Sequence, residues 1–162
     1  MDEIHVIGGK CLHGNITVQG SKNTVLPLMA GALLYRGINV LKACPRITDV
    51  FYMEEILRAL GAETWWEDHD LYLDCTHADG SHVPEIYSGR MRSSIILLGP
   101  ILARNQQAEI GYPGGCVIGK RPVDLHLYVL RRFGAEIKEE EKKITVSCKK
   151  LCGTEIVFSK RS

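Results

Sequence analysis

The sequence has no long apolar run and no excess of charge of one sign. No apolar stretch approaches the roughly 18 residues that a membrane-spanning helix needs. The acidic start, MDEIHVIGGK, lacks the basic region and apolar core of a secretory signal. The 162 residues carry a formal net charge of +1, too little to build the broad basic face of a general nucleic-acid-binding protein. These absences predict a cytoplasmic protein with no membrane and no nucleic-acid partner.

Cysteine pairs and histidine clusters that would bind a metal are also missing. The six cysteines contain no CxxC pair, and without a secretory signal their even number is weak support for disulfides. We expect reduced thiols, mostly buried as small apolar side chains, with Cys116 as the exception. The histidines that show no metal-ligand spacing are His5, His13, His69, His77 and His82. We therefore predict neither a metal nor a cofactor.

An internal repeat is present instead. Apolar residues make up 45% of the chain and charged residues 24%, which suffices for one globular domain with a core. Within it, Leu57–Glu63 (LRALGAE) recurs at a spacing of 73 residues as Leu130–Glu136 (LRRFGAE). At the same spacing, Leu71–Cys75 recurs as Ile144–Cys148. A register kept over both pairs of segments indicates two copies of one structural unit.

Each copy is predicted to contain the same elements in the same order. Gly61 and Gly134 stand where a left-handed helix C-cap is needed, and alternation marks the closing strands. Trp65 and Trp66 fall in one such strand, so one of them should face inward. The expected helices cover 21–35, 48–60, 90–104 and 122–133, and the clearest strands 38–41, 70–75, 108–111 and 143–148. With one further leading strand, each unit is a βαβαββ repeat.

Two segments are predicted to be leading strands of such units, at 12–18 and 151–158. The second would open a third unit, and the sequence ends where its helix should begin. Because a repeat unit cannot bury both of its faces alone, we expect a portion of a longer repeat protein. The unpaired strand at 151–158 would then favour self-association.

One loop differs between the copies. The second copy has five more residues before its second helix, giving Pro113–Pro122 (PGGCVIGKRP). Glycines allow close approach of the backbone to a ligand, and the adjacent Lys120 and Arg121 favour the thiolate form of Cys116. The alternative interpretation is a surface turn that carries an incidental thiol.

Cations are predicted at three helix starts, where free N–H groups and the helix dipole favour anions. They are Lys22, Arg92 and Arg121. Together they would suit a ligand that carries phosphate and carboxylate, although each alone could be a solvated charge. Asp49 is expected in the first turn of its helix, where a carboxylate is favourable for structural reasons.

These residues resemble one enzyme family in order and spacing. The matching motifs are Gly20–Asn23 (GSKN), Met91–Ser94 (MRSS), Leu98–Pro100 (LGP), Leu102–Arg104 (LAR), Pro113–Cys116 (PGGC) and Arg121–His126 (RPVDLH). The chain resembles UDP-N-acetylglucosamine enolpyruvyl transferases over essentially its whole length. The resemblance implies an α/β fold, an inside-out α/β barrel of βαβαββ units, here two units and one leading strand. It also implies that residues 1–21 pack with a second domain and that 22–162 form an incomplete first one.

The resemblance implies transfer of the enolpyruvyl group of phosphoenolpyruvate to the 3′-hydroxyl of UDP-N-acetylglucosamine, with release of phosphate. This step commits the sugar to peptidoglycan and cell-wall synthesis, on which cell shape and division depend, and it is inhibited by fosfomycin. By resemblance the catalytic residues are Cys116, Lys22 and Arg121, and phosphoenolpyruvate is bound by Lys22, Asn23 and Arg121. The residues implied for the nucleotide sugar are Arg92, Arg121, Pro122, Val123, Asp124, Leu125, His126, Lys160 and Ser162.

Two other interpretations stay open. The related shikimate-pathway enolpyruvyl transferase shares the repeat and the Ser-Lys-Asn start, but it has no use for the Gly-Gly-Cys loop. A non-catalytic, nucleotide-sugar-binding fragment is the second alternative. In the resembled family the second domain supplies a carboxylate and further cations, so we expect the present chain by itself to be inactive.

Overall fold

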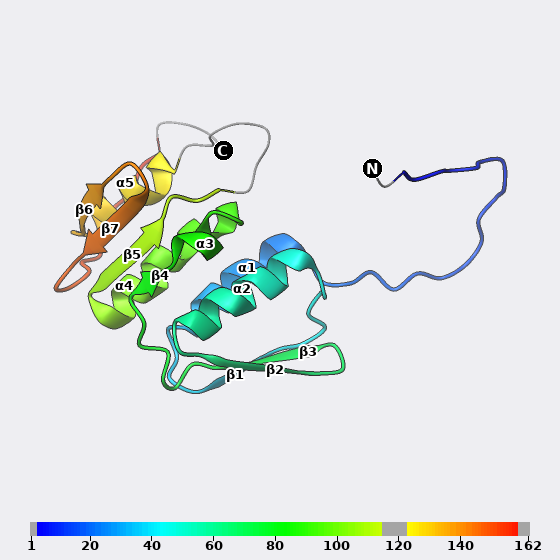
Figure 1. The fold of residues 1–162 in the computed structure, drawn as a ribbon, viewed down its shortest axis with the longest axis horizontal. Helices are drawn as coiled ribbons and strands as arrows, with labels where there is room; N and C mark the ends of the chain where they lie inside the picture. Colours follow the sequence, from blue (N-terminus) through cyan, green and yellow to red (C-terminus); the bar gives the residue numbers. More distant parts are fainter. Residues whose placement is uncertain (1–2, 115–122, 159–162) are drawn as a thin grey trace.

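The fold consists of two similar α/β units, each a small sheet with helices on one face (Figure 1). The computed structural model describes residues 3–114 and 123–158. The elements of the first unit are α1 (Lys22–Ala32), β1 (Ile38–Leu41), α2 (Thr48–Ala59), β2 (Glu63–Glu67) and β3 (Asp70–Asp74). Those of the second are β4 (His82–Val83), α3 (Glu85–Ser88), the 3₁₀ helix η1 (Arg92–Leu97), α4 (Leu98–Asn105), β5 (Gln107–Gly111), α5 (Asp124–Arg132), β6 (Glu136–Glu139) and β7 (Lys143–Ser147).

The three strands of the first sheet have the same order as β5, β7 and β6 of the second, which confirms the predicted repeat, and β4 is an additional edge strand of the second sheet. The first sheet runs β1-β3-β2 and the second β4-β5-β7-β6, with every pair antiparallel except β4 and β5. Alternate residues of the central strands are fully buried, Leu71 and Leu73 in β3 and Ile144 and Val146 in β7. Because side chains alternate across a strand, the other face of each sheet points away from the helices. One continuous core joins the two units.

Both second helices end in the predicted way. Gly61 and Gly134 have φ values of 98° and 92°, a region that a side chain makes unfavourable. Gly61 N–H donates to the Arg58 carbonyl, and Gly134 N–H donates to that of Arg131. The same type of C-cap therefore ends α2 and α5, and after each helix the chain turns back toward the sheet of that unit.

The predicted leading strands at 12–18 and 151–158 are wrong, because neither segment forms a strand in the structure. Residues 3–20 extend away from the body of the molecule (Figure 1), and Leu12 is 93% exposed. A strand needs a neighbouring strand for its backbone groups, and this segment has none among the described residues. The segment 151–158 instead runs beside α5, where Phe133 accepts from Cys152 N–H and Arg132 donates to the Glu155 carbonyl.

The helix predicted at 90–104 is divided into η1 and α4, and α3 precedes them. The buried hydroxyl of Ser94 donates to the Ser88 carbonyl at 3.3 Å. Such a local side-chain bond competes with regular helix geometry. The chain therefore adopts the tighter 3₁₀ geometry around Ser94. Within the described ranges, no helix has the length and apolarity required to cross a bilayer.

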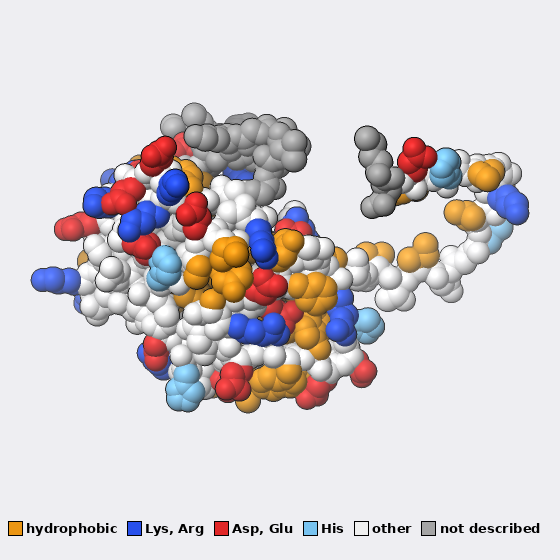
Figure 2. Space-filling model, viewed as in Figure 1, with side chains coloured by type: hydrophobic (Ala, Val, Ile, Leu, Met, Phe, Trp, Pro, Cys, Tyr) orange, Lys and Arg blue, Asp and Glu red, His pale blue; other side chains and the backbone are white. Residues whose placement is uncertain are grey.

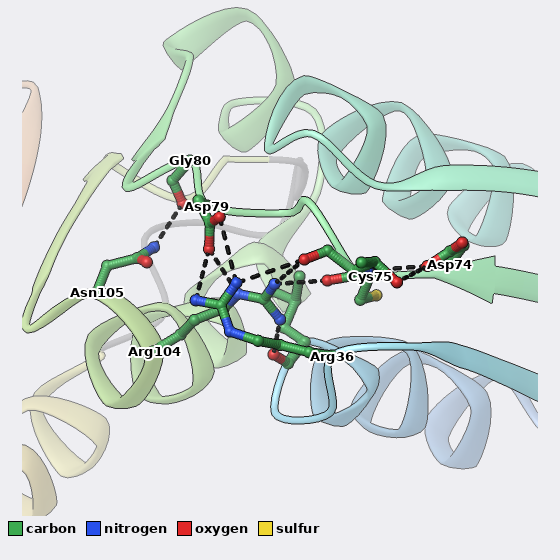
Figure 3. Close-up of polar contacts among 9 residues, drawn as sticks. Arg36, Asp74, Cys75, Asp79, Gly80, Arg104 and Asn105 are labelled. Atoms are coloured by element: carbon green, nitrogen blue, oxygen red, sulfur yellow. Dashed lines mark hydrogen bonds and ion pairs between the residues drawn. The ribbon is translucent and has the colours of Figure 1, made fainter.

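Arg104 joins the two units through a buried guanidinium (Figure 3). Its side chain is 4% exposed, and it donates to the carbonyls of Leu33 at 2.7 Å, Cys75 at 2.5 Å and Thr76 at 3.1 Å. Its Nε also lies 3.3 Å from Asp79, a carboxylate that Arg36 contacts at 2.8 Å. Most of the Arg104 contacts therefore lie in the turn that follows β3, and a separate ion pair joins Arg90 to Glu55 of α2 at 3.6 Å.

Candidate active site

Lys22 and Asn23 begin α1, as the sequence predicted. Ser21 is the N-cap residue, with extended backbone angles, and its carbonyl accepts from Thr24 and Val25 N–H. The Ser21 side chain makes no capping hydrogen bond. The first turn of α1 is thus formed by the backbone.

Lys22 forms an ion pair with Asp49, with Nζ 2.9 Å from Oδ2. Asp49 lies in the first turn of α2 as predicted, so the contact brings the N-terminal ends of α1 and α2 together. Two positive helix ends and an ammonium group favour an anion at this place. The sequence predicted only a structural role for Asp49, in the first turn of its helix, and did not predict its contact with Lys22. No local spacing indicates the pair, which depends on the parallel packing of two helices.

Arg92 and the start of α5 form a second group of predicted residues. Arg92 is the first residue of η1, and Asp124 is the first residue of α5. His126 is exposed, but desolvation of its imidazole by neighbouring atoms lowers its pKa, the nearby Arg92 charge lowers it further, and Asp124 opposes the shift. His126 is therefore favoured in its neutral form next to a fixed positive charge. Val123, directly before α5, is buried.

A groove of about 590 Å³ lies between η1–α4 and α5. Leu125 and His126, both predicted to bind the nucleotide sugar, are among the residues that line it. The others are Ile95, Ile96, Gly99, Val129, Leu130, Phe133 and Phe158. The predicted residues of α5 therefore face a largely apolar hollow with one imidazole at its wall.

The stem of the cysteine loop is attached next to Arg92. Gly114 N–H donates to the Ser88 carbonyl at 3.2 Å. A Cβ at Gly114 would collide with the carbonyl oxygen of Gly89, so this approach requires glycine. Gly114, the last described residue before Cys116, consequently lies beside the turn that leads into η1. Predicted site residues that lie outside the described ranges are Cys116, Arg121, Pro122, Lys160 and Ser162.

Two other thiols are poorly suited to act as nucleophiles. Burial, and secondarily the Glu54 carboxylate, raise the pKa of Cys44 to about 11. Burial also raises the pKa of Cys75, which the Arg104 charge partly opposes. Within residues 3–114 and 123–158, no three metal-binding side chains converge.

The architecture defines the class of protein. The chain matches the enolpyruvyl transferase NikO from Streptomyces tendae with a TM-score of 0.75 and 24% identity, over 89% of this chain and 32% of that one. It matches EPSP synthase from Acinetobacter baumannii with a TM-score of 0.65 and 18% identity, over 87% and 33%. The fold is therefore the enolpyruvyl transferase fold, which confirms the predicted fold class.

Sequence comparison gives the family. Residues 6–162 match the family model of EPSP synthase (3-phosphoshikimate 1-carboxyvinyltransferase), and the chain belongs to this family. It is 40% identical over 156 residues to UDP-N-acetylglucosamine 1-carboxyvinyltransferase 2 of Caldanaerobacter subterraneus subsp. tengcongensis, covering 96% of this chain and 37% of that protein. The chain thus spans little more than a third of the length of this curated relative.

Proposed function

We propose that this chain is part of a UDP-N-acetylglucosamine enolpyruvyl transferase. The observation that carries the proposal is the 40% identity, over nearly the whole chain, to a relative named for that reaction. The site geometry supports it, because Arg92, His126 and the loop stem at Gly114 lie around one end of the second unit. The complete enzyme would act in peptidoglycan synthesis in the cytoplasm, before the cell wall is assembled.

The proposed reaction is an addition followed by an elimination. The Cys116 thiol donates a proton to the methylene carbon of phosphoenolpyruvate, and the sugar 3′-oxygen bonds to the neighbouring carbon as its hydroxyl proton passes to the carboxylate expected from the second domain. The resulting Cys116 thiolate takes a proton back from the methyl group, which restores the double bond as phosphate leaves. Lys22 and Arg121 stabilise the anionic groups electrostatically, and Asn23 donates a hydrogen bond at the reacting centre.

The nucleotide sugar is proposed to bind at the second unit. Arg92 supplies a positive charge for its diphosphate, and Val123, Asp124 and Leu125 offer backbone N–H groups at the start of α5, with the His126 side chain beside them. Arg121, Pro122, Lys160 and Ser162 complete this site in the proposal. Residues 1–21 would pack against a second domain, which is consistent with the exposed apolar side chains of 3–20. Self-association of the chain through 151–158 stays a prediction that light scattering can check.

The shikimate-pathway transferase is the second candidate, since the family model carries that name. The two candidate enzymes differ in their acceptor substrate, so ligand binding can distinguish them. Amide NMR spectra of the chain should shift at Val123–His126 on addition of UDP-N-acetylglucosamine and stay unchanged with shikimate 3-phosphate. Arg92→Gln should weaken the first response, whereas Lys138→Gln on the far sheet face should not.

The same samples test turnover. With phosphoenolpyruvate and UDP-N-acetylglucosamine together, the chain alone should release phosphate at the background rate, because domain closure normally assembles such a site and excludes water. A spectral response to shikimate 3-phosphate at α5, with none to the nucleotide sugar, would favour the second candidate. No response to either ligand would contradict a nucleotide-sugar site on this unit.

A further inference from the structure

The outer face of the first sheet carries an apolar row that crosses all three strands. Val40 in β1 pairs with Tyr72 in β3, and Tyr72 pairs with Trp65 in β2. The rings of Trp65 and Tyr72 stack, with centroids 5.1 Å apart and planes at 15°. Ile38, two residues before Val40, is 54% exposed. These four side chains, here named the aromatic row, point away from α1 and α2.

Four carboxylates surround the aromatic row, and none has a cationic partner among residues 3–114 and 123–158. Glu63 and Asp74 lie opposite each other at one end of the strands, and Glu67 and Asp70 at the other. None forms an ion pair with a lysine, arginine or histidine in the described part of the chain. The negative charge around the row is therefore not neutralised by those residues.

The second sheet provides an internal comparison. At the positions that correspond to Val40, Tyr72 and Trp65, it has Glu109, Thr145 and Lys138, aligned by the same strand pairing. There the carboxylate is neutralised, since Glu109 lies 3.0 Å from Lys143 and 3.0 Å from His82. The repeat fold therefore does not require an aromatic row or unpaired carboxylates on this face.

From this contrast we propose that the outer face of the first sheet binds a basic segment of a partner protein. Arginine or lysine side chains would lie over the Trp65 and Tyr72 rings, where cations are attracted to the π face, and would pair with the surrounding carboxylates. Apolar side chains of the segment would cover Ile38 and Val40. Figure 2 shows this composition, with hydrophobic side chains between acidic ones along the lower edge of the view, where Figure 1 places β1–β3. The surface lies on the opposite face of the sheet from α1 and α2, away from the Lys22–Asp49 pair.

The test uses the 162-residue chain and a fluorescein-labelled peptide of alternating arginine and valine, followed by fluorescence anisotropy. The peptide should bind, and added salt should weaken binding because the carboxylates are exposed. The Trp65→Lys, Tyr72→Thr double variant places the residues of the second sheet on the first and should bind at least about fivefold more weakly. The reverse variant, Lys138→Trp with Thr145→Tyr, is the matched control for aromatic content.

A second variant keeps the aromatic row and removes charge. Glu63→Gln with Glu67→Gln is chosen because Asp70 and Asp74 accept hydrogen bonds from Ala43 N–H and Thr76, which hold local structure. Glu67 accepts a hydrogen bond from Trp65 Nε1–H at 3.3 Å, and a glutamine amide oxygen can still accept it. Peptide binding to this variant should lose most of its dependence on salt concentration. Unchanged affinity in both variants, equal binding of an aspartate–valine peptide, or absence of binding to the arginine–valine peptide would overturn the proposal. So would a monomer–dimer shift caused by Trp65→Lys without the peptide, which would make the face an interface between copies of this chain.

Discussion

At the scale of single residues, the Lys22–Asp49 pair is better suited to hold a functional ammonium group than to stabilise the fold. The two side chains are 49% and 31% exposed, and exposed ion pairs contribute only about 0.2–1 kcal/mol to stability. The contact joins the starts of two helices, where an anionic substrate would be attracted. The carboxylate therefore competes with any anion that binds Lys22.

Asp49→Asn should leave the free energy of unfolding within about 1 kcal/mol of the parent. It should also tighten binding of phosphoenolpyruvate to the chain severalfold at low salt, since the ammonium loses its competing partner, and this gain should fade as salt is added. Isothermal titration measures the binding, and Lys22→Gln should abolish it. Glu139→Gln, which removes the similarly exposed Arg131–Glu139 pair, is the control. A loss of affinity in Asp49→Asn would show instead that the carboxylate orients Lys22.

The cysteines are predicted to differ strongly in reactivity. Cys44 and Cys75 are buried and have raised pKa values, so they stay protonated and protected. Cys116 follows two glycines and precedes Lys120 and Arg121 in the sequence, a setting that favours the thiolate.

Peptide mapping after treatment with fosfomycin should find the adduct at Cys116 and none at Cys44 or Cys75. Unfolding in denaturant before treatment with a general alkylating reagent should make all of the thiols reactive, which controls for burial. Equal modification of the exposed Cys11 and Cys152 under native conditions would contradict special activation of Cys116.

At the scale of elements, the turn after β3 holds the two units together. Arg104→Met removes a buried guanidinium and its hydrogen bonds to three carbonyls, of which those of Cys75 and Thr76 keep a longer bond from Ala78 N–H and from Arg36. We expect a loss of about 3 kcal/mol or more in the free energy of unfolding, measured by urea denaturation. Arg36→Met, which removes the other arginine in contact with Asp79, should cost much less because Arg36 is largely exposed. Equal losses in the two variants would contradict this role of Arg104.

Asp79 in the same turn is expected to make the stability of the protein depend on pH. Hydrogen bonds from Arg36 and, less strongly, from Arg104 hold the pKa of Asp79 below its ordinary value of 3.8. A carboxyl group with a lowered pKa in the folded state stabilises the protein above the unfolded-state pKa, and it loses that effect as pH falls through the folded-state value. Asp79→Asn should therefore be less stable than the parent at neutral pH, and the difference should begin to shrink at about pH 4 and disappear once the pH is below the folded-state pKa of Asp79.

The elements that could be predicted from sequence are those specified by local patterns. Gly61 and Gly134 mark helix ends because the required backbone angle is local, and alternation marks β3 and β7. The prediction that one of Trp65 and Trp66 faces inward is confirmed, since Trp66 donates to the buried Glu54 carboxylate. The strands at 12–18 and 151–158 were wrong because strand formation depends on a partner that local sequence does not specify.

At the scale of the whole molecule, the repeat places the site but does not complete it. The repeat predicts two equivalent helix starts, and the structure positions Lys22 at one and Arg92 at the second. The sequence could not predict that Asp49 pairs with Lys22 or that Arg92 lies beside His126. Both contacts depend on how helices that are far apart in the sequence pack together. Because the curated relative is more than twice as long as the chain, further groups around the site are expected from the rest of such a protein.

The Arg104 contacts also bear on how the polypeptide folds as it is synthesised. Domains form in order from the N-terminus as the chain emerges, so the first unit is available before its neighbour. The carbonyls of Leu33, Cys75 and Thr76 nevertheless lack their Arg104 hydrogen bonds until that later part of the chain has been synthesised. The first unit on the ribosome should therefore be an open, protease-sensitive intermediate that closes only after α4 has left the exit tunnel.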